Sequence, residues 1–276
     1  MHLPTILSAL MATTVWAHME LHSPAPFNST HNPHRTSPAD PYLQYPYDCC
    51  GPNDRWTYPC RGYLSLLGTP EGAPTATWEA GSMQTWNLSG IGNHYGGSCQ
   101  VGFSDDKGKT FRVATSYEGN CPYRKNGVGP DGQDFAMQVP ADLATGVQVF
   151  AWIWYNREQE FNMNCAAVNI TAPASTPGTY ASPPTPSSST IIPFSSRPEM
   201  FIADDGNGCL TPHTTAELKY PLPGPEVVMG DGEYPLALPS GDCSAGNEVG
   251  KQGYGGETGE DGHATPTPGL DISLGI

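Results

Sequence analysis

The chain has 276 residues, a formal net charge of −15 and only 14% charged residues, together with 32 glycines and 29 prolines. This composition is typical of a loop-rich β protein rather than a helical one. The excess of negative charge argues against nucleic acid or an anionic membrane as a partner, and fits a soluble secreted protein with a neutral partner.

The first 17 residues have the features of a signal peptide. Residues 5–17 are mostly apolar or small, carry no charge and end in Val15-Trp16-Ala17, with small residues at the positions that a signal peptidase recognises. Cleavage after Ala17 would make His18 the first residue of a secreted, extracellular chain. An N-terminal histidine offers its α-amine and ring Nδ1 to one metal ion. One further imidazole would complete the planar three-nitrogen set that suits Cu(II). The alternative is that cleavage falls elsewhere, or that a histidine follows the signal by chance.

Cysteines and acceptor sequons agree with secretion. Behind a signal peptide, eight cysteines predict a disulfide framework formed in an oxidising compartment. Asn28, Asn87 and Asn169 each begin an N-glycosylation sequon, which predicts a glycoprotein. The cysteines are Cys49, Cys50, Cys60, Cys99, Cys121, Cys165, Cys209 and Cys243.

The segments in chain order predict short strands joined by turns. Residues 18–63 are polar and proline-rich, and we expect irregular structure there. A hairpin around Lys107-Gly108 would bring Cys99 and Cys121 close together, so we expect these two cysteines to be bonded. Residues 147–155 are apolar on both faces, as in a central strand of a sandwich. The predicted strands are 75–78, 83–88, 98–103, 110–116, 135–139, 147–155 and 160–170.

The last of these strands alternates with a period of two. Phe161, Met163 and Cys165 share one face, and Glu160 and Asn162 share the other together with the next asparagine. We expect the polar face to project toward a site at one end of the sandwich.

The remainder of the chain divides by composition. Residues 173–196 are rich in Ser, Thr and Pro and are expected to form a spacer. Residues 197–243 regain an ordered pattern, with Cys209 and Cys243 as a natural pair. Residues 244–276 are rich in glycine and acidic residues and predict a disordered tail. The expected organisation is one domain over residues 18–243, and we find no segment apolar and long enough to span a membrane.

His94 is the candidate second metal ligand. It lies in a glycine-rich loop, residues 89–97, directly before the strand that begins near Cys99. Glycines allow the backbone to approach another segment closely, and the adjacent disulfide would fix that strand. With His18, His94 would complete a histidine brace.

Six motifs in one order carry a resemblance to a known family. They are residues 18–27 (HMELHSPAPF), 94–100 (HYGGSCQ), 118–122 (EGNCP), 151–157 (AWIWYNR), 163–166 (MNCA) and 198–203 (PEMFIA). The chain resembles the fungal chitin-active lytic polysaccharide monooxygenases of auxiliary activity family eleven. The resemblance implies an immunoglobulin-like or fibronectin-III-like β-sandwich with one copper ion held by His18 and His94. It also implies a Cys60–Cys165 disulfide, and it leaves the pairing of Cys49 and Cys50 open.

One departure from the family pattern affects the copper site. In the family, a Glu and a Tyr two residues apart precede the Met-Asn-Cys motif and flank the copper. Here the glutamate is Glu160, but Asn162 occupies the tyrosine position. The resemblance assigns Glu160 to orienting or protonating the oxygen species. An asparagine at the copper axis would be a weak oxygen donor or would leave room for water.

The resemblance therefore implies a secreted monomeric monooxygenase or peroxygenase that cleaves chitin or a related insoluble β-linked polysaccharide. It would use copper, an external electron donor, and O2 or H2O2. A second hypothesis is a non-catalytic protein that keeps the brace for copper binding, and Asn162 favours it. A third is a disulfide-rich extracellular structural domain in which His18 and His94 are ordinary surface residues. A glycosidase is less well supported, because no sequence feature places two carboxylates across a sugar.

Overall fold

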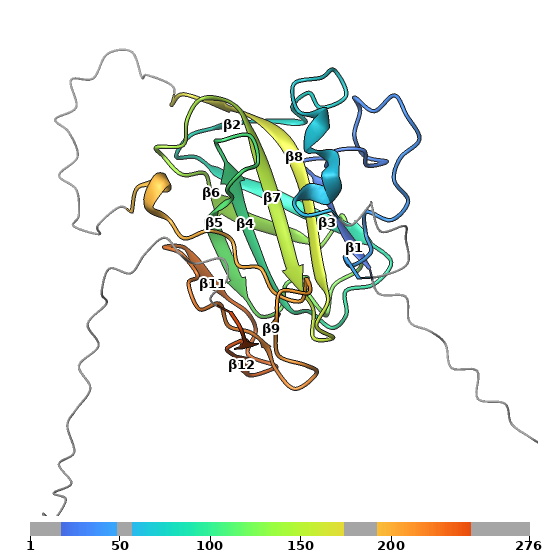
Figure 1. Ribbon diagram of the computed structural model, residues 1–276, viewed down its shortest axis with the longest axis vertical. Helices are drawn as coiled ribbons and strands as arrows, with labels where there is room; N and C mark the ends of the chain where they lie inside the picture. The colour runs from blue at the N-terminus through green and yellow to red at the C-terminus, as the bar shows by residue number, and fades with distance from the viewer. Residues whose placement is uncertain (1–17, 49–56, 174–191, 244–276) are drawn as a thin grey trace, which may run out of the picture.

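The protein is a β-sandwich of two unequal sheets (Figure 1). The computed structural model describes residues 18–48, 57–173 and 192–243. The predictions for residues 1–17, for Cys49 and Cys50, for most of the spacer and for the tail lie outside these ranges. Within them, no helix is long and apolar enough to cross a membrane.

The smaller sheet has three antiparallel strands in the order β1-β3-β6, and the larger has six in the order β11-β5-β4-β7-β8-β2. The small-sheet strands are β1 (Met19–Ser23), β3 (Met83–Gly90) and β6 (Asp134–Gln138). The large-sheet strands are β2 (Ala76–Glu79), β4 (Ser98–Ser104), β5 (Arg112–Glu118), β7 (Gly146–Tyr155), β8 (Phe161–Thr171) and β11 (Val227–Met229).

The predicted sandwich and its central strand are confirmed. β7 lies between β4 and β8, and each of its side chains from Val149 onward is fully buried. Trp152 and Trp154 point into the core between the sheets, whereas Ile153 and Tyr155 belong to a second cluster on the outer face of the large sheet. Each large apolar side chain contributes about 2–3 kcal/mol on burial. Burial on both faces explains why β7 is continuously apolar in sequence.

The alternation predicted for β8 is also confirmed. Phe161, Met163 and Cys165 belong to the outer cluster, and Ala166 and Val168 belong to the core between the sheets. The inner face at the start of β8 carries Asn162 and Asn164, both of which are buried. The polar face is thus enclosed by the sandwich rather than open to solvent.

The three disulfides that we expected are present. Cys60 bonds to Cys165, Cys99 to Cys121, and Cys209 to Cys243. The first ties the 3-10 segment η2 (Cys60–Leu66) to β8, and the second closes the β4–β5 hairpin.

Two segments differ from the prediction. β1 forms within residues 18–63, where we expected irregular structure, because Met19 and Leu21 point into the core while the strand pairs with β3. The end of the predicted spacer is also ordered: the 3-10 turn η3 (Phe194–Ser196) places Phe194 in the core at 2% exposure. The buried Phe194 ring and a 2.8 Å hydrogen bond from Phe194 N to the Asp142 carboxylate anchor this stretch.

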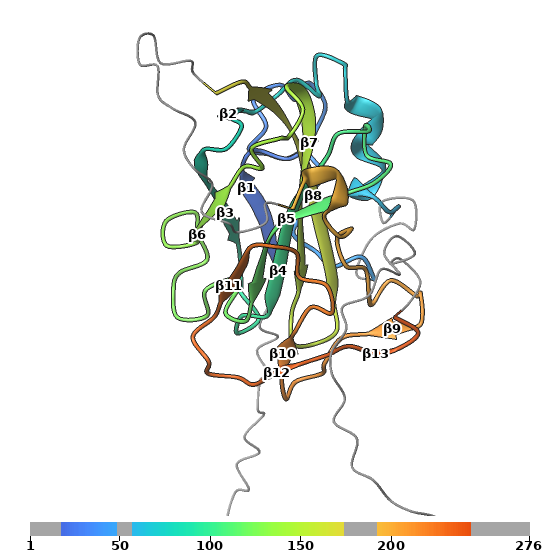
Figure 2. The same ribbon diagram turned by 90° about the vertical axis from the view of Figure 1, so that its left-hand side faces the viewer.

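The segment after the spacer packs along one end of the sandwich. Figure 2 shows β9 (Cys209–Leu210), β10 (Glu217–Leu218), β12 (Leu236–Ala237) and β13 (Ser240–Gly241) gathered at the bottom of the molecule. This is the end at which β7 finishes and β8 begins (Figure 1). The C-terminal segment, residues 192–243, therefore borders the loops that carry the candidate site.

Candidate metal centre

His18 lies directly before β1, at an edge of the small sheet. Its backbone carbonyl accepts a hydrogen bond of 2.9 Å from Ile91 N, and its ring lies against that of Tyr45 with the centroids 4.1 Å apart. The end of β3 approaches so closely that a Cβ on Gly90 would lie 2.0 Å from the His18 carbonyl oxygen. Glycine at position 90 therefore allows β3 to hold the backbone of His18.

His94 lies in the loop that leads from β3 to β4. His94 and Tyr95 both have positive φ angles, 45° and 57°, which is unusual for residues with a side chain. Trp154 Nε1 donates a 3.0 Å hydrogen bond to the Gly96 carbonyl. A Cβ on Gly97 would lie 2.2 Å from a backbone oxygen of β7. The loop is thus held tightly against the end of β7, and contacts from elsewhere in the fold maintain its two positive φ angles.

That support comes from the C-terminal segment. The Glu217 carboxylate accepts a 2.8 Å hydrogen bond from Gly97 N and a 3.0 Å bond from Asn120 N. Arg124 pairs with Glu217 at 3.0 Å and donates to the Tyr95 carbonyl at 2.6 Å. The two charged side chains are 4% and 1% exposed. A buried ion pair therefore fixes the loop that carries His94.

The structure brings the rings of His18 and His94 together. Their centroids lie 6.1 Å apart with an interplanar angle of 75°. His18 Nδ1 and His94 Nε2 are both buried and make no hydrogen bond, and the same is true of both polar atoms of the Asn162 amide. Buried polar atoms nearly always have a partner. Four buried atoms without a hydrogen bond, on three predicted site residues, therefore fit a group such as a metal ion at this position.

The protonation of His18 favours metal binding. Burial, and then the positive charge that His94 can carry, lower the pKa of His18 to about 4. The His18 ring is consequently neutral near pH 7, as a metal-binding imidazole must be.

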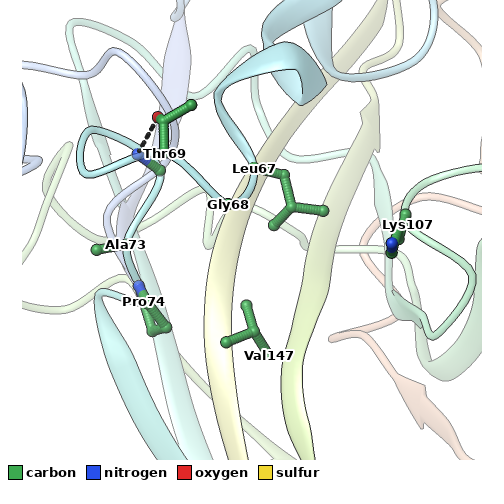
Figure 3. A pocket seen from close by; sticks show the side chains of 8 residues that line it. Leu67, Gly68, Thr69, Ala73, Pro74, Lys107 and Val147 are labelled. Atoms are coloured by element: carbon green, nitrogen blue, oxygen red, sulfur yellow. Dashed lines mark hydrogen bonds between the residues drawn. The ribbon is translucent and has the colours of Figure 1, made fainter.

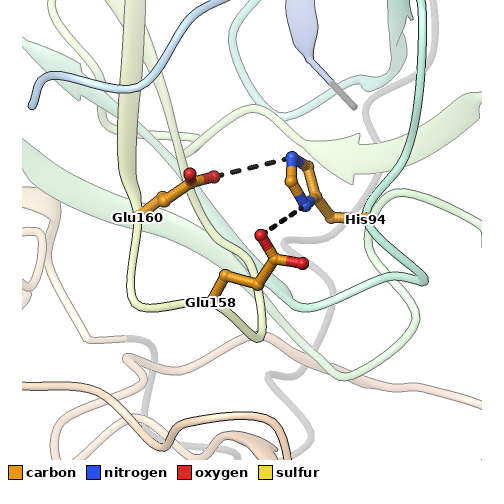
Figure 4. Close-up of side chains that lie close together, drawn as sticks. All are labelled: His94, Glu158 and Glu160. Atoms are coloured by element: carbon orange, nitrogen blue, oxygen red, sulfur yellow. Dashed lines mark ion pairs between the residues drawn. The ribbon is translucent and has the colours of Figure 1, made fainter. Parts of the chain in front are cut away.

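Two glutamates flank the imidazole of His94, one at each ring nitrogen (Figure 4). Glu160 Oε2 lies 3.5 Å from Nε2, and Glu158 Oε2 lies 3.3 Å from Nδ1. Among residues 18–48, 57–173 and 192–243, this is the one group of three His, Cys, Asp or Glu side chains whose ligand atoms all lie within 4.8 Å of one another.

Asn156 organises the turn between β7 and β8 that carries these glutamates. Its Oδ1 accepts hydrogen bonds from Glu158 N at 2.9 Å and from Glu160 N at 3.3 Å. Its Nδ2 donates to the Glu160 carboxylate. Burial raises the pKa of Glu160 above its usual range, although the Asn156 hydrogen bond and His94 act in the opposite direction. Glu160 is therefore more readily protonated than an exposed glutamate.

Asn162 lies on the inner face of β8, opposite Trp154 in the β7–β8 ladder. It is 1% exposed, and Phe161 points to the opposite face, into the outer cluster. Trp154 in turn lies 5.7 Å from the His94 ring, centroid to centroid. Asn162 thus lies on the face and at the end of the strand that the sequence predicts for it.

A pocket of about 450 Å³ lies elsewhere in the molecule (Figure 3). Its lining includes Leu67, Pro74 and Val147, with Lys107 at one side. Val147 is at the start of β7, so roughly 25 Å of strand separates it from the His94 loop. The pocket is not part of the histidine site.

Four residues of this region were predicted from the sequence, and others were not. His18, His94, Glu160 and Asn162 were predicted, whereas Asn156, Glu158 and Glu217 were not. An asparagine directly after a strand is a common turn-forming residue, so Asn156 carried a usable signal. Glu217 lies 120 residues from Gly97 in sequence, and no local pattern links the two.

Comparison with known proteins assigns the family. No family model matches the chain. It is 35% identical over 210 residues to AA11 family lytic polysaccharide monooxygenase A of Aspergillus fumigatus, covering 75% of this chain and 83% of that protein. It is 28% identical over 250 residues to AA11 family lytic polysaccharide monooxygenase B of the same species, covering 86% of this chain but only 55% of that longer protein.

Among solved structures, T. fusca AA10A matches 56% of this chain and 100% of its own, at 19% identity and a TM-score of 0.32, which is too low to support a conclusion. The sequence relationship to these enzymes identifies a copper-dependent oxidative enzyme. The chain belongs to the AA11 family of lytic polysaccharide monooxygenases.

Proposed function

We propose that this enzyme is secreted, holds one copper ion between His18 and His94, and cleaves chitin or a related crystalline β-linked polysaccharide. The observation that carries the proposal is the pair of buried nitrogens without hydrogen bonds, His18 Nδ1 and His94 Nε2, on rings 6.1 Å apart. Two imidazole nitrogens and an amine form a donor set that suits copper.

The third donor depends on removal of residues 1–17. In the uncleaved chain the His18 nitrogen is part of a peptide bond, whereas cleavage after Ala17 converts it into an α-amine. The amine and Nδ1 of one residue then close a chelate ring. Bound copper supplies the one-electron chemistry by which an external reductant and O2 or H2O2 oxidise the carbohydrate.

The surrounding side chains handle protons and substrate. Glu160, whose carboxyl group is held by Asn156 and has a raised pKa, can hold a proton beside Nε2 of His94 and release it there. Tyr95, which follows His94 directly in sequence, is 63% exposed, and its ring can offer an apolar surface to a sugar face. The net charge of −15 suits a neutral polymer better than a polyanion.

Chitin is the substrate implied by the resemblance of the sequence motifs. A ligand pair at the end of the sandwich, beside the exposed Tyr95, can approach a flat crystal face. The pocket that includes Val147 lies at the other end of β7 and has no part in this proposal.

The test is a copper titration of the chain that begins at His18, together with a search for oxidised oligosaccharides. We expect one tightly bound Cu(II), lost in His94→Ala and in a variant with one alanine added before His18. His34→Ala should bind copper normally, because His34 contacts the Pro74 carbonyl instead. With reductant and H2O2, chitin should yield oxidised products. Unchanged copper affinity in the extended variant would exclude the brace. Tight copper binding without oxidised products from chitin, cellulose or other β-glycans would exclude the proposed substrates and favour a copper-binding role.

A further inference from the structure

Glu158 is a residue near the metal centre to which the proposed function gives no role. Only Nε2 of His94 is needed for the copper, and Glu160 lies on that side of the ring. Glu158 lies on the other side, with Oε2 3.3 Å from Nδ1 (Figure 4).

The chemistry of imidazole gives this position a consequence. A neutral imidazole carries one N–H, and the partner of one nitrogen determines which nitrogen keeps the proton. Of the two flanking carboxylates, Glu158 is the nearer, at 3.3 Å from Nδ1 against 3.5 Å between Glu160 and Nε2. The nearer carboxylate favours the proton on Nδ1, which leaves the lone pair of Nε2 free for a metal ion. Nε2 is the nitrogen that is buried and makes no hydrogen bond.

The backbone around Glu158 is anchored, although its side chain is 54% exposed. Asn156 Oδ1 accepts a hydrogen bond from Glu158 N at 2.9 Å. On the far side of the turn, Gln159 Nε2 donates to the Thr211 carbonyl at 2.6 Å. The Arg157 carbonyl accepts a hydrogen bond from Thr214 N in the C-terminal segment. The guanidinium carbon of Arg157 lies 3.4 Å from the Tyr234 ring centroid. The position of Glu158 is thus set from both sides of the turn.

We infer that Glu158 is a positioning residue for the copper centre: it accepts the Nδ1–H of His94, fixes the tautomer and ring orientation, and makes Nε2 a stronger donor. The inference rests on the proposed copper ligation for its effect on the metal. A more electron-rich imidazole stabilises Cu(II) relative to Cu(I), so Glu158 should lower the reduction potential of the bound ion. Mutation of a residue that hydrogen-bonds the second nitrogen of a metal-binding histidine typically lowers metal affinity or activity by about 10–100-fold.

The first test needs no metal. Two-bond 1H–15N NMR correlations of the metal-free protein report which nitrogen of His94 carries the proton. We expect the Nδ1–H form in the wild type at pH 8 and a shift toward the Nε2–H form in Glu158→Ala. An Nε2–H form in the wild type would overturn the inference, whether or not the protein binds copper.

The second test uses the copper-loaded protein. Glu158→Ala should weaken Cu(II) binding by about tenfold or more, change the Cu(II) EPR spectrum and raise the midpoint potential. Glu158→Gln keeps an acceptor but removes the charge, so it should retain the tautomer and much of the affinity while still raising the potential. Glu226→Gln, which removes the same charge from an exposed position, is the control. The inference would be overturned if Glu158→Ala had the same copper affinity, EPR spectrum and midpoint potential as the control variant. Failure of the wild type to bind copper would instead contradict the proposed function, and the NMR result would then decide the role of Glu158 alone.

Discussion

The side-chain oxygen of Asn164 accepts a 2.9 Å hydrogen bond from the backbone N–H of Leu21, across the interior of the sandwich. β1 is an edge strand of the small sheet, and Asn164 belongs to β8 of the large sheet. The same amide donates to the Leu43 carbonyl at 3.0 Å. One buried side chain thus joins the two sheets three residues after His18 and also holds the loop that follows β1.

Asn164→Ala should therefore destabilise the fold and weaken the metal centre. Loss of the amide leaves the Leu21 N–H and the Leu43 carbonyl buried without this partner, so we expect the free energy of unfolding to fall by about 2–4 kcal/mol. Copper affinity should fall as well, because His18 directly precedes β1. Urea unfolding of the metal-free protein and a copper titration measure the two effects. Asn87→Ala is the control, since Asn87 bonds to Asp134 at the surface; an equal loss in both variants would contradict the role given to Asn164.

Asn162 should control the axis of the copper site. Asn162→Tyr restores the aromatic side chain that the family pattern has there, so we expect altered Cu(II) EPR parameters. Overpacking should cost about 1–3 kcal/mol of stability. Phe161→Tyr, on the opposite face of β8, should change stability but leave the EPR spectrum as it is. If the spectrum responds to the Phe161 variant and not to the Asn162 variant, the axial position lies elsewhere.

The buried pair of Arg124 and Glu217 should be essential for the His94 loop. Glu217→Ala removes one of the two carboxylates that pair with the buried Arg124 guanidinium and leaves Asp231 as the other. We expect a loss of about 3–5 kcal/mol in the free energy of unfolding and weaker copper binding. The exposed pair Lys125–Glu233 offers a matched control, with side chains 72% and 41% exposed. Glu233→Ala should cost less than about 1 kcal/mol. Comparable losses in the two variants would show that the loop does not depend on the buried pair.

Asp106 should give the β4–β5 hairpin a dependence on pH. Burial acts to raise the pKa of Asp106, but hydrogen bonds from Thr110, Ser104 and Lys109 outweigh it and lower the pKa below its usual 3.8. The ionised carboxylate therefore stabilises the folded state above pH 3.8, and this contribution is lost as the pH falls through the lowered value. The difference in unfolding free energy between wild type and Asp106→Asn should be constant above about pH 5 and shrink below pH 4. A difference that stays constant down to pH 2 would contradict this assignment.

The sequence predicted features that repeat over several residues. β7 and β8 were predictable because burial on two faces, or alternation across ten residues, leaves a clear pattern. β1 was missed because Met19 and Leu21 provide only two inward positions in a proline-rich region. Glu158 and Glu217 were missed for a different reason: their roles depend on contacts made by a turn and by a distant segment. Such contacts leave no periodic signal in the sequence.

The way in which the C-terminal segment is attached determines what happens when the chain is cleaved ahead of it. Both of its cysteines, Cys209 and Cys243, bond to each other. It is held to the sandwich by non-covalent contacts, which include β11 on β5, Phe194 in the core and Glu217 beneath the His94 loop. Proteolysis within residues 174–191 would therefore yield two complementing fragments in a binding equilibrium. Copper affinity of the nicked protein would then depend on its concentration, because dilution would separate the fragment that carries the proposed ligands His18 and His94 from the fragment that supports the His94 loop.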